Sequence, residues 1–206
     1  MSSAELPHLP ALPRERADAA RNRARIVSAA ERLFARHGIE AVTMDQVARE
    51  AGIGPGTLYR RFPNKGALAE ALAVTWTVQL QDEVLERLGD RTRSPRADLD
   101  WLLLRLVRYN DENAPLMAAV AGTGGGTHER RNWYTTPIYL WAHAVVVLLL
   151  ERGRERGETS ADLDVDHTAD VLLSAISIDL FRAQRARGWS TERIEAGARR
   201  LLHCLT

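Results

Sequence analysis

Two adjoining segments decide the fold: residues 43–54, TMDQVAREAGIG, and residues 55–62, PGTLYRRF. Thr43 and Gln46 have the spacing of a capping box, in which each side chain accepts a hydrogen bond from the other residue's backbone N–H at a helix start. Gly52 follows as a residue without a Cβ, which tolerates a sharp turn. Pro55 suits the first position of a second helix, where its missing N–H costs nothing. The segments therefore predict two short helices, 43–51 and 55–62, joined by a glycine turn.

The second of these helices has an inward and an outward face. Leu58 and Phe62 are one helical turn apart and are predicted to be buried. The outward face presents a hydroxyl, a phenol and two guanidinium groups, on Thr57, Tyr59, Arg60 and Arg61. Such groups suit contacts with phosphates and base edges. A pair of short helices with these properties is typical of the helix-turn-helix of DNA-binding proteins.

The charge distribution agrees with a DNA-binding N-terminus. Residues 1–65 hold ten Arg and one Lys against seven acidic residues, a net charge of +4, whereas the remainder holds 17 basic and 20 acidic residues, a net charge of −3. A basic segment joined to a slightly acidic one is expected of a nucleic-acid-binding module attached to another domain. Five arginines at the start of the chain form either a DNA-contacting arm or a solubilising surface: Arg14, Arg16, Arg21, Arg23 and Arg25.

The rest of the chain has the 3.6-residue periodicity of helices, so we expect an all-α protein. We predict a flexible tail over residues 1–12, a three-helix helix-turn-helix domain over 13–70, and a larger helical ligand-binding and dimerisation domain over 71–206. A long helix should begin after Asn64 and reach about Leu88. Further helices are expected from Pro95, from Asn113, from Pro137 to about 156, from Asp164 or Asp166 to about 187, and from Ser190.

The larger domain is rich in aromatic residues, and an aromatic-lined cavity between helices is a usual kind of site for apolar ligands. The candidates for lining this site are Trp101, Tyr109, Trp133 and Trp141, with His143 as a polar group. Packing in an ordinary core is the alternative for each of them. Asp179 interrupts an apolar helix, where it is either a buried carboxylate with a partner or a solvent-facing residue.

The helices 137–156 and 166–187 are the candidates for a dimer interface. Their apolar surface is too broad for one small domain to cover, and small residues allow close approach of two helices. The interface candidates are Val145, Leu148, Ala175 and Ile178. We therefore predict a homodimer with a four-helix bundle across a two-fold axis.

Catalytic, metal-binding and membrane roles have little support. Cys204 is the single cysteine, the six histidines lack metal-ligand spacing on one helix face, and the glycine-rich residues 122–127 lack the preceding strand and the lysine of a phosphate loop. The longest apolar run, Ala144–Leu150, is too short to cross a bilayer, and the N-terminus lacks a signal peptide's apolar centre. We expect a cytoplasmic protein that is not an enzyme and has no metal or cofactor.

The residues quoted above resemble the DNA-binding domain of the tetracycline-repressor family of bacterial transcription regulators, over residues 21–75. The resemblance implies a homodimer that places one recognition helix per subunit in successive major grooves and is controlled by a small-molecule effector. It implies backbone contacts by Thr43, Tyr59, Arg61 and Lys65, and positions facing base edges at Pro55, Gly56, Thr57 and Arg60. Pro55 stands where the family often has a polar residue, and Arg61 where it often has His.

The function expected is that of a ligand-responsive regulator, most simply a repressor released from a pseudo-palindromic double-stranded DNA operator by its effector. Two alternatives remain at this stage. One is a ligand-independent all-α DNA-binding protein, and the other is an all-α enzyme or carrier whose basic N-terminus is incidental. A second domain whose core has no cavity would favour the ligand-independent DNA-binding protein. Detectable turnover without DNA binding would favour the enzyme or carrier.

Overall fold

The computed structural model describes residues 17–122, 134 and 136–203, with only the backbone for 17–18 and 117–122. The expected tail, the first two arginines of the possible arm, the residues 123–127, Trp133 and Cys204 lie outside these residues. In the described part of the chain, helices dominate and no strand occurs, so the all-α prediction is confirmed. In the same residues, no helix is long and apolar enough to cross a membrane.

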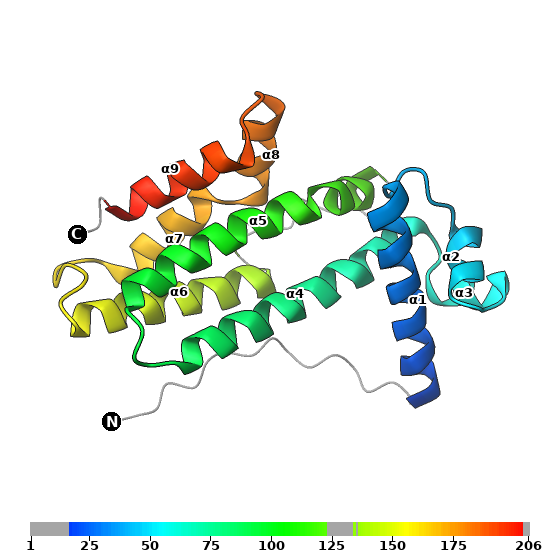
Figure 1. The fold of residues 1–206 in the computed structure, drawn as a ribbon, viewed down its shortest axis with the longest axis horizontal. Coiled ribbons are helices and arrows are strands. Elements are labelled where there is room, and N and C mark those ends of the chain that lie inside the picture. Colours follow the sequence, from blue (N-terminus) through cyan, green and yellow to red (C-terminus); the bar gives the residue numbers. More distant parts are fainter. Residues whose placement is uncertain (1–16, 123–133, 135, 204–206) are drawn as a thin grey trace. The chain divides into compact units, whose positions relative to one another are not determined.

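Figure 1 shows the helices in their order along the chain. They are α1 (Ala17–His37), α2 (Met44–Glu50), α3 (Pro55–Arg61), α4 (Lys65–Gly89), α5 (Pro95–Gly122), α6 (Pro137–Glu155), α7 (Val165–Ala175), α8 (Ile178–Ala186) and α9 (Thr191–His203). Several begin at the caps that the sequence predicts. The Asn64 Oδ1 atom accepts from the Ala67 N–H at 2.9 Å, and Asp164, one of two candidates, accepts from the His167 N–H at 3.0 Å.

The described residues form two compact units. The first, called the head here, comprises residues 17–79 and 113–122, and therefore contains α1, α2, α3, most of α4 and the end of α5. The second, called the body, comprises residues 80–112, 134 and 136–203. The helices α4 and α5 thus each contribute residues to both units.

The core of the head is built where α1, α3 and α4 bury their apolar stripes. Ile26, Leu58, Leu68 and Leu72 have no exposed surface, and Phe62 is almost fully buried beside them. Deleting most of such a side chain typically costs about 2–5 kcal/mol, because lost burial adds to the cavity that remains. This core therefore holds α2 and α3 against α1 without using the outward side chains of α3.

The separate helix expected from Asn113 does not form. Instead, α5 continues through Pro115 to Gly122. A proline inside a helix removes one backbone hydrogen bond and normally favours a break. Here the flanking residues Asn113 and Leu116 are both buried, and Leu116 belongs to the head core. Tertiary packing therefore outweighs the local preference of Pro115.

The prediction of a single helix over 166–187 is also wrong, because α7 ends at Ala175 and a separate helix, α8, begins at Ile178. Ile176 leaves the helical conformation, and Ser177 caps the next helix by accepting from the Leu180 N–H at 3.4 Å. Asp179 lies in the first turn of α8 and is exposed. The break thus places this carboxylate in solvent, which corresponds to the second of its two interpretations.

Candidate nucleic-acid interface

The helix α2 begins with the capping box that its sequence predicts. The Gln46 N–H donates to Thr43 Oγ1 at 3.2 Å, and the Thr43 N–H donates to Gln46 Oε1 at 2.7 Å. Val42 and Val47, which flank the box, are both buried. The Thr43 side chain is thereby fixed at the N-terminal, partially positive end of a helix, where anions such as phosphates are favoured.

The turn between α2 and α3 depends on Gly52, whose φ of +63° lies in the left-handed region. The Ile53 N–H reaches back to the Ala48 carbonyl at 3.0 Å, and the Gly52 N–H to the Arg49 carbonyl at 3.1 Å. Ala48 has no exposed surface. Its small side chain lets α2 pack closely within the head.

The helix α3 has the two faces expected of a recognition helix. Leu58 is buried, whereas Tyr59 has 45% of its surface exposed and Arg60 is also exposed. Pro55 and Gly56, in the first turn, are exposed, and Thr57 is half-buried. The first turn holds no acidic residue, and the last turn holds Arg60 and Arg61. The outward face is therefore positively charged and carries both hydroxyl and guanidinium groups.

Gly56 leaves room on the outward face of α3. A Cβ built at this position would meet no atom within 4 Å, so the surrounding protein does not require a glycine. Absence of a side chain permits close approach of another backbone. A DNA strand lying against the first turn of α3 would use this space.

Two residues expected to contact the DNA backbone also make contacts within the head. The Lys65 ammonium donates to the carbonyls of Ile39 and Glu40, at 2.8 and 3.2 Å, and so holds the connection between α1 and α2. The Arg61 guanidinium donates to the Ala19 carbonyl at the start of α1. Both side chains are half-buried, and their orientations are therefore set by the fold.

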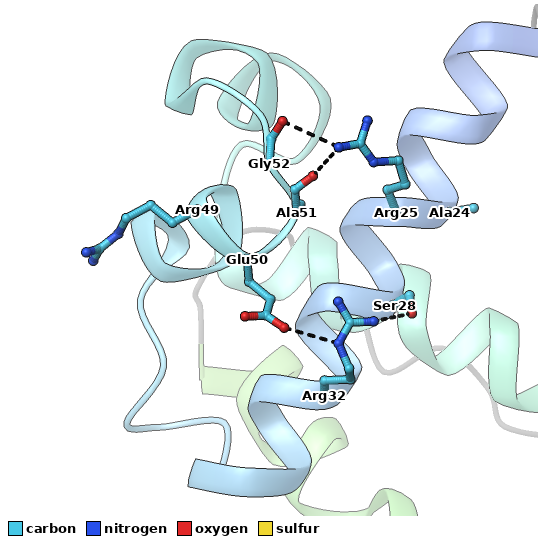
Figure 2. Close-up of a pocket in the computed structure, with 8 residues that line it drawn as sticks. All are labelled: Ala24, Arg25, Ser28, Arg32, Arg49, Glu50, Ala51 and Gly52. Carbon is cyan, nitrogen blue, oxygen red and sulfur yellow. Dashed lines mark hydrogen bonds and ion pairs between the residues drawn. The ribbon is translucent and has the colours of Figure 1, made fainter.

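A pocket of about 490 Å³ lies between α1 and α2, and no local sequence pattern predicts it. Figure 2 shows Arg25 and Arg32 on α1 reaching toward the end of α2. Arg25, which the sequence places in a possible DNA-contacting arm, donates from Nη2 to the Ala51 carbonyl at 2.7 Å and to the Gly52 carbonyl at 3.4 Å. No local pattern predicts this bond, because the two partners are 26 residues apart.

The candidate ligand residues have different surroundings in the body. Trp141 is 3% exposed, and the half-buried Trp101 ring lies under the Arg87 guanidinium, with 4.5 Å between Cζ and the ring centroid. His143 Nε2 lies 3.3 Å from both the Asp166 carbonyl and an Asp170 carboxylate oxygen. Tyr109 is half-buried. These positions do not by themselves bring the four residues into one site, so the lining remains a prediction.

The candidate dimer residues divide into two groups. Leu148, Ala175 and Ile178 are partly exposed and remain open to a partner chain. Val145 has no exposed surface in the single chain, so it has nothing left to offer a partner without rearrangement. Two apolar residues that were not candidates are more exposed, Leu140 at 57% and Val171 at 49%, and they lie on the adjacent helices α6 and α7.

Comparisons with known proteins agree with this geometry. The family model of bacterial regulatory proteins of the tetR family matches residues 26–72, which extend from α1 into α4. A helix-turn-helix-type transcriptional regulator of Staphylococcus aureus strain MRSA252 is 49% identical over 176 residues, covering 82% of this chain and 85% of that protein. The chain belongs to the TetR family. It is thus a DNA-binding transcriptional regulator, and α2 and α3 are its helix-turn-helix.

Other relatives of this TetR-family regulator match over shorter stretches or in fold alone. A transcriptional regulator of S. aureus strain USA300 is 49% identical over 53 residues, 26% of this chain and 29% of that protein. The solved TetR/AcrR-family regulator of Thermobifida fusca has a TM-score of 0.66 and 21% identity, covering 88% of this chain and 96% of that one. FadR of Thermus thermophilus, a TetR-family repressor in complex with lauroyl-CoA, has a TM-score of 0.60 and 21% identity, covering 87% and 92%.

Proposed function

We propose that this TetR-family regulator is a homodimeric repressor, which a small-molecule effector releases from a pseudo-palindromic operator. The observation that carries the proposal is the two-faced α3, with Leu58 buried beneath an exposed surface that contains Tyr59 and Arg60. Side chains held in this way suit the major groove, where guanidinium groups read guanine edges. A bacterial regulator meets its DNA operator in the cytoplasm, so we propose this location for the protein.

The contacts divide into two classes. Thr43, Tyr59, Arg61 and Lys65 bind the DNA backbone and set the register of the head on the duplex, whereas Pro55, Gly56, Thr57 and Arg60 face base edges. The helix start at Thr43 and the open space at Gly56 support this division. Two heads of a dimer would engage half-sites one helical turn, about 34–36 Å, or a multiple of it apart.

The effector binds in the body and has an apolar part that carries a hydrogen-bond acceptor. Long-chain acyl-CoA thioesters are the first class to test, because lauroyl-CoA is bound by the solved T. thermophilus repressor. Two buried donors support an acceptor-bearing ligand: in the described residues, Gln81 Nε2 and Trp141 Nε1 have no hydrogen-bond partner. A buried donor without an acceptor costs about 1–3 kcal/mol, which a ligand carbonyl oxygen would recover.

The second copy of the chain covers apolar surface on α6, α7 and the start of α8. Leu140 and Val171 have about half of their surface exposed, and Leu148 and Ile178 are also accessible. Exposed apolar groups on two adjacent helices of a soluble domain favour association with a partner. A two-fold axis would then fix the separation of the two recognition helices.

Effector control requires the ligand to bind one conformation more tightly than the other, and coupling of this kind typically amounts to about 1–3 kcal/mol. The helix α4 is the route proposed for this coupling, because its residues belong to both head and body. An effector that changes the position of α4 changes the spacing of the two recognition helices of the dimer. The two helices can then no longer bind both half-sites of the operator at once.

Selection of bound duplexes from a random pool tests DNA recognition and two-fold symmetry together. Enrichment of an inverted repeat with half-sites one turn apart is the expected result. Titration of the protein on that duplex with lauroyl-CoA or stearoyl-CoA should then raise the Kd, whereas coenzyme A alone should not. Recovery of no preferred sequence would overturn the proposed function. Binding unaffected by either thioester would overturn only the effector class.

A further inference from the structure

Arg25 links α1 directly to the turn that leads into the recognition helix. Its Nη2 atom lies 2.7 Å from the Ala51 carbonyl oxygen and 3.4 Å from that of Gly52. Figure 2 shows the guanidinium between α1 and this turn, with both bonds to the turn marked. The N-cap of α3, Gly54, follows only two residues after Gly52. The bond therefore acts on the segment that determines where α3 begins.

The turn needs such a donor. The last carbonyls of a helix lack partners within the helix, and they carry the partial negative charge of its C-terminus. Ala48 and Arg49 accept from backbone N–H groups of the turn, whereas the Ala51 carbonyl accepts from Arg25. A charged donor makes a stronger hydrogen bond than a neutral one, so the guanidinium is well matched to this position.

Gly52 and Arg25 are matched in space as well. A Cβ at residue 52 would lie 3.0 Å from Arg25 Nη2, and the backbone there already has a φ of +63°. The glycine thus permits both the left-handed turn and the approach of the guanidinium. Glu50 adds ion pairs with Arg32 and Arg36 at 3.1 and 3.2 Å, but both arginine side chains are more than half exposed, and such pairs contribute little.

We propose that Arg25 is a positioning residue for base recognition: it holds the turn after α2 and thereby sets the orientation of α3 in the major groove. The proposal rests on the proposed function, because it concerns how accurately α3 reads an operator. Hydrogen bonds to base edges require accurate placement of α3, whereas contacts with the flexible DNA backbone tolerate small rotations of this helix. Loss of the Arg25 bond should therefore reduce discrimination between operators more than general affinity.

A phosphate contact by Arg25 is the competing explanation, and the two differ in what they predict. A phosphate contact contributes about one unit to the dependence of log Kd on log salt, and its loss weakens binding to every sequence alike. A positioning role leaves the salt dependence unchanged but affects the discrimination ratio, which is the Kd for a single-base variant divided by the Kd for the operator. Loss of a positioning residue lowers this ratio. A merely destabilised head leaves that ratio unchanged, because only the fraction of active protein falls.

The experiment compares Arg25→Gln and Arg25→Lys with Arg49→Gln in the full chain. Arg49 lines the same pocket, and its change to Gln removes the same positive charge. However, the Arg49 side chain points away from α1 (Figure 2), and its Nε atom donates to the Asp45 carbonyl of its own helix at 3.4 Å. Lysine keeps the charge at position 25 on a shorter side chain without the guanidinium fork. The duplex is the one selected with the wild-type protein, together with a variant changed at one base pair of the half-site.

Arg25→Gln should lower the discrimination ratio about tenfold, the effect of losing one hydrogen bond to a charged group. Arg25→Lys should lower the discrimination ratio as well, and neither Arg25 variant should change the salt slope. Arg49→Gln should leave the discrimination ratio within twofold of wild type. An unchanged discrimination ratio in Arg25→Gln, or an equal decrease of this ratio in Arg49→Gln, would overturn the proposal. Selective operator binding by the wild-type protein would still support the proposed function in either case. If Arg25→Gln does not fold, the Arg25→Lys ratio decides.

Discussion

The indole N–H of Trp76 donates a 2.7 Å hydrogen bond to a carboxylate oxygen of Glu31, and this bond joins α4 to α1 inside the head. Trp76 also packs against the head core. Because α4 continues into the body, whatever displaces this helix acts on α1 through these contacts. The pair therefore lies on the route that we propose for effector control of the recognition helix.

Trp76→Phe should lower the free energy of unfolding by about 1–2 kcal/mol, because the hydrogen bond is lost and the carboxylate remains partly buried. Urea denaturation measures this change. Glu31→Gln keeps an acceptor and should cost less. In a double-mutant cycle, Trp76→Phe combined with Glu31→Ala should cost less than the sum of the single changes. Strict additivity would show that the bond contributes nothing to stability.

Thr43→Ala should destabilise the head by about 1 kcal/mol, since the N-terminal cap of α2 loses the side-chain acceptor for the Gln46 N–H. It should also weaken operator binding, because the proposed phosphate contact is lost. Thr43→Ser keeps the hydroxyl and is the matched control. Thermal unfolding and fluorescence anisotropy measure the two effects. Equal stability of the alanine and serine variants would contradict the role of the cap.

Arg60→Ala and Lys65→Ala should affect DNA binding in different ways. Arg60 is exposed on α3 and faces base edges in our proposal, so its loss should alter base preference by about 1–3 kcal/mol at one position. Lys65→Ala should weaken binding to all sequences and lower the salt slope by about one. Arg61→Ala should behave as Lys65→Ala does. Competition binding at several salt concentrations separates these effects, and a sequence-selective loss at Lys65 would contradict the division.

Lys65→Ala should in addition destabilise the connection between α1 and α2, since the ammonium donates to the carbonyls of Ile39 and Glu40. Lys65→Arg keeps the charge and donors, and should restore most of the stability. Unfolding in urea tests this separately from the DNA measurement. If Lys65→Ala were as stable as wild type, these two hydrogen bonds would have no net value.

Tyr139 should make stability depend on pH in alkaline solution. Burial, followed by its hydrogen bond to Asp170, raises the pKa of the phenol in the folded state above the ordinary value of about 10. The unfolded chain therefore loses this proton first, and its contribution to stability is present below pH 10 and lost as the pH rises further. Tyr139→Phe should show a smaller decrease in unfolding free energy above pH 10. Parallel pH profiles would contradict this assignment.

The helix-turn-helix could be predicted from the sequence because its signals are local. The capping pair Thr43 and Gln46 is three residues apart, and the inward pair Leu58 and Phe62 four, so backbone geometry alone relates their side chains. Other parts of the chain were less predictable. The continuation of α5 through Pro115 and the break before Ile178 depend on which neighbouring residues are buried, which the local pattern does not contain.

By itself, the sequence determined the all-α class, the two short helices with their glycine turn, and the outward face of α3, because these follow from hydrogen bonding and periodicity over a few residues. Only the tertiary structure decided that Arg25 holds the turn at Ala51, that Lys65 holds the α1–α2 connection, and that Trp76 meets Glu31. These pairs are between 26 and 45 residues apart. Long, flexible side chains have many possible partners at such separations, and packing of the helices selects one.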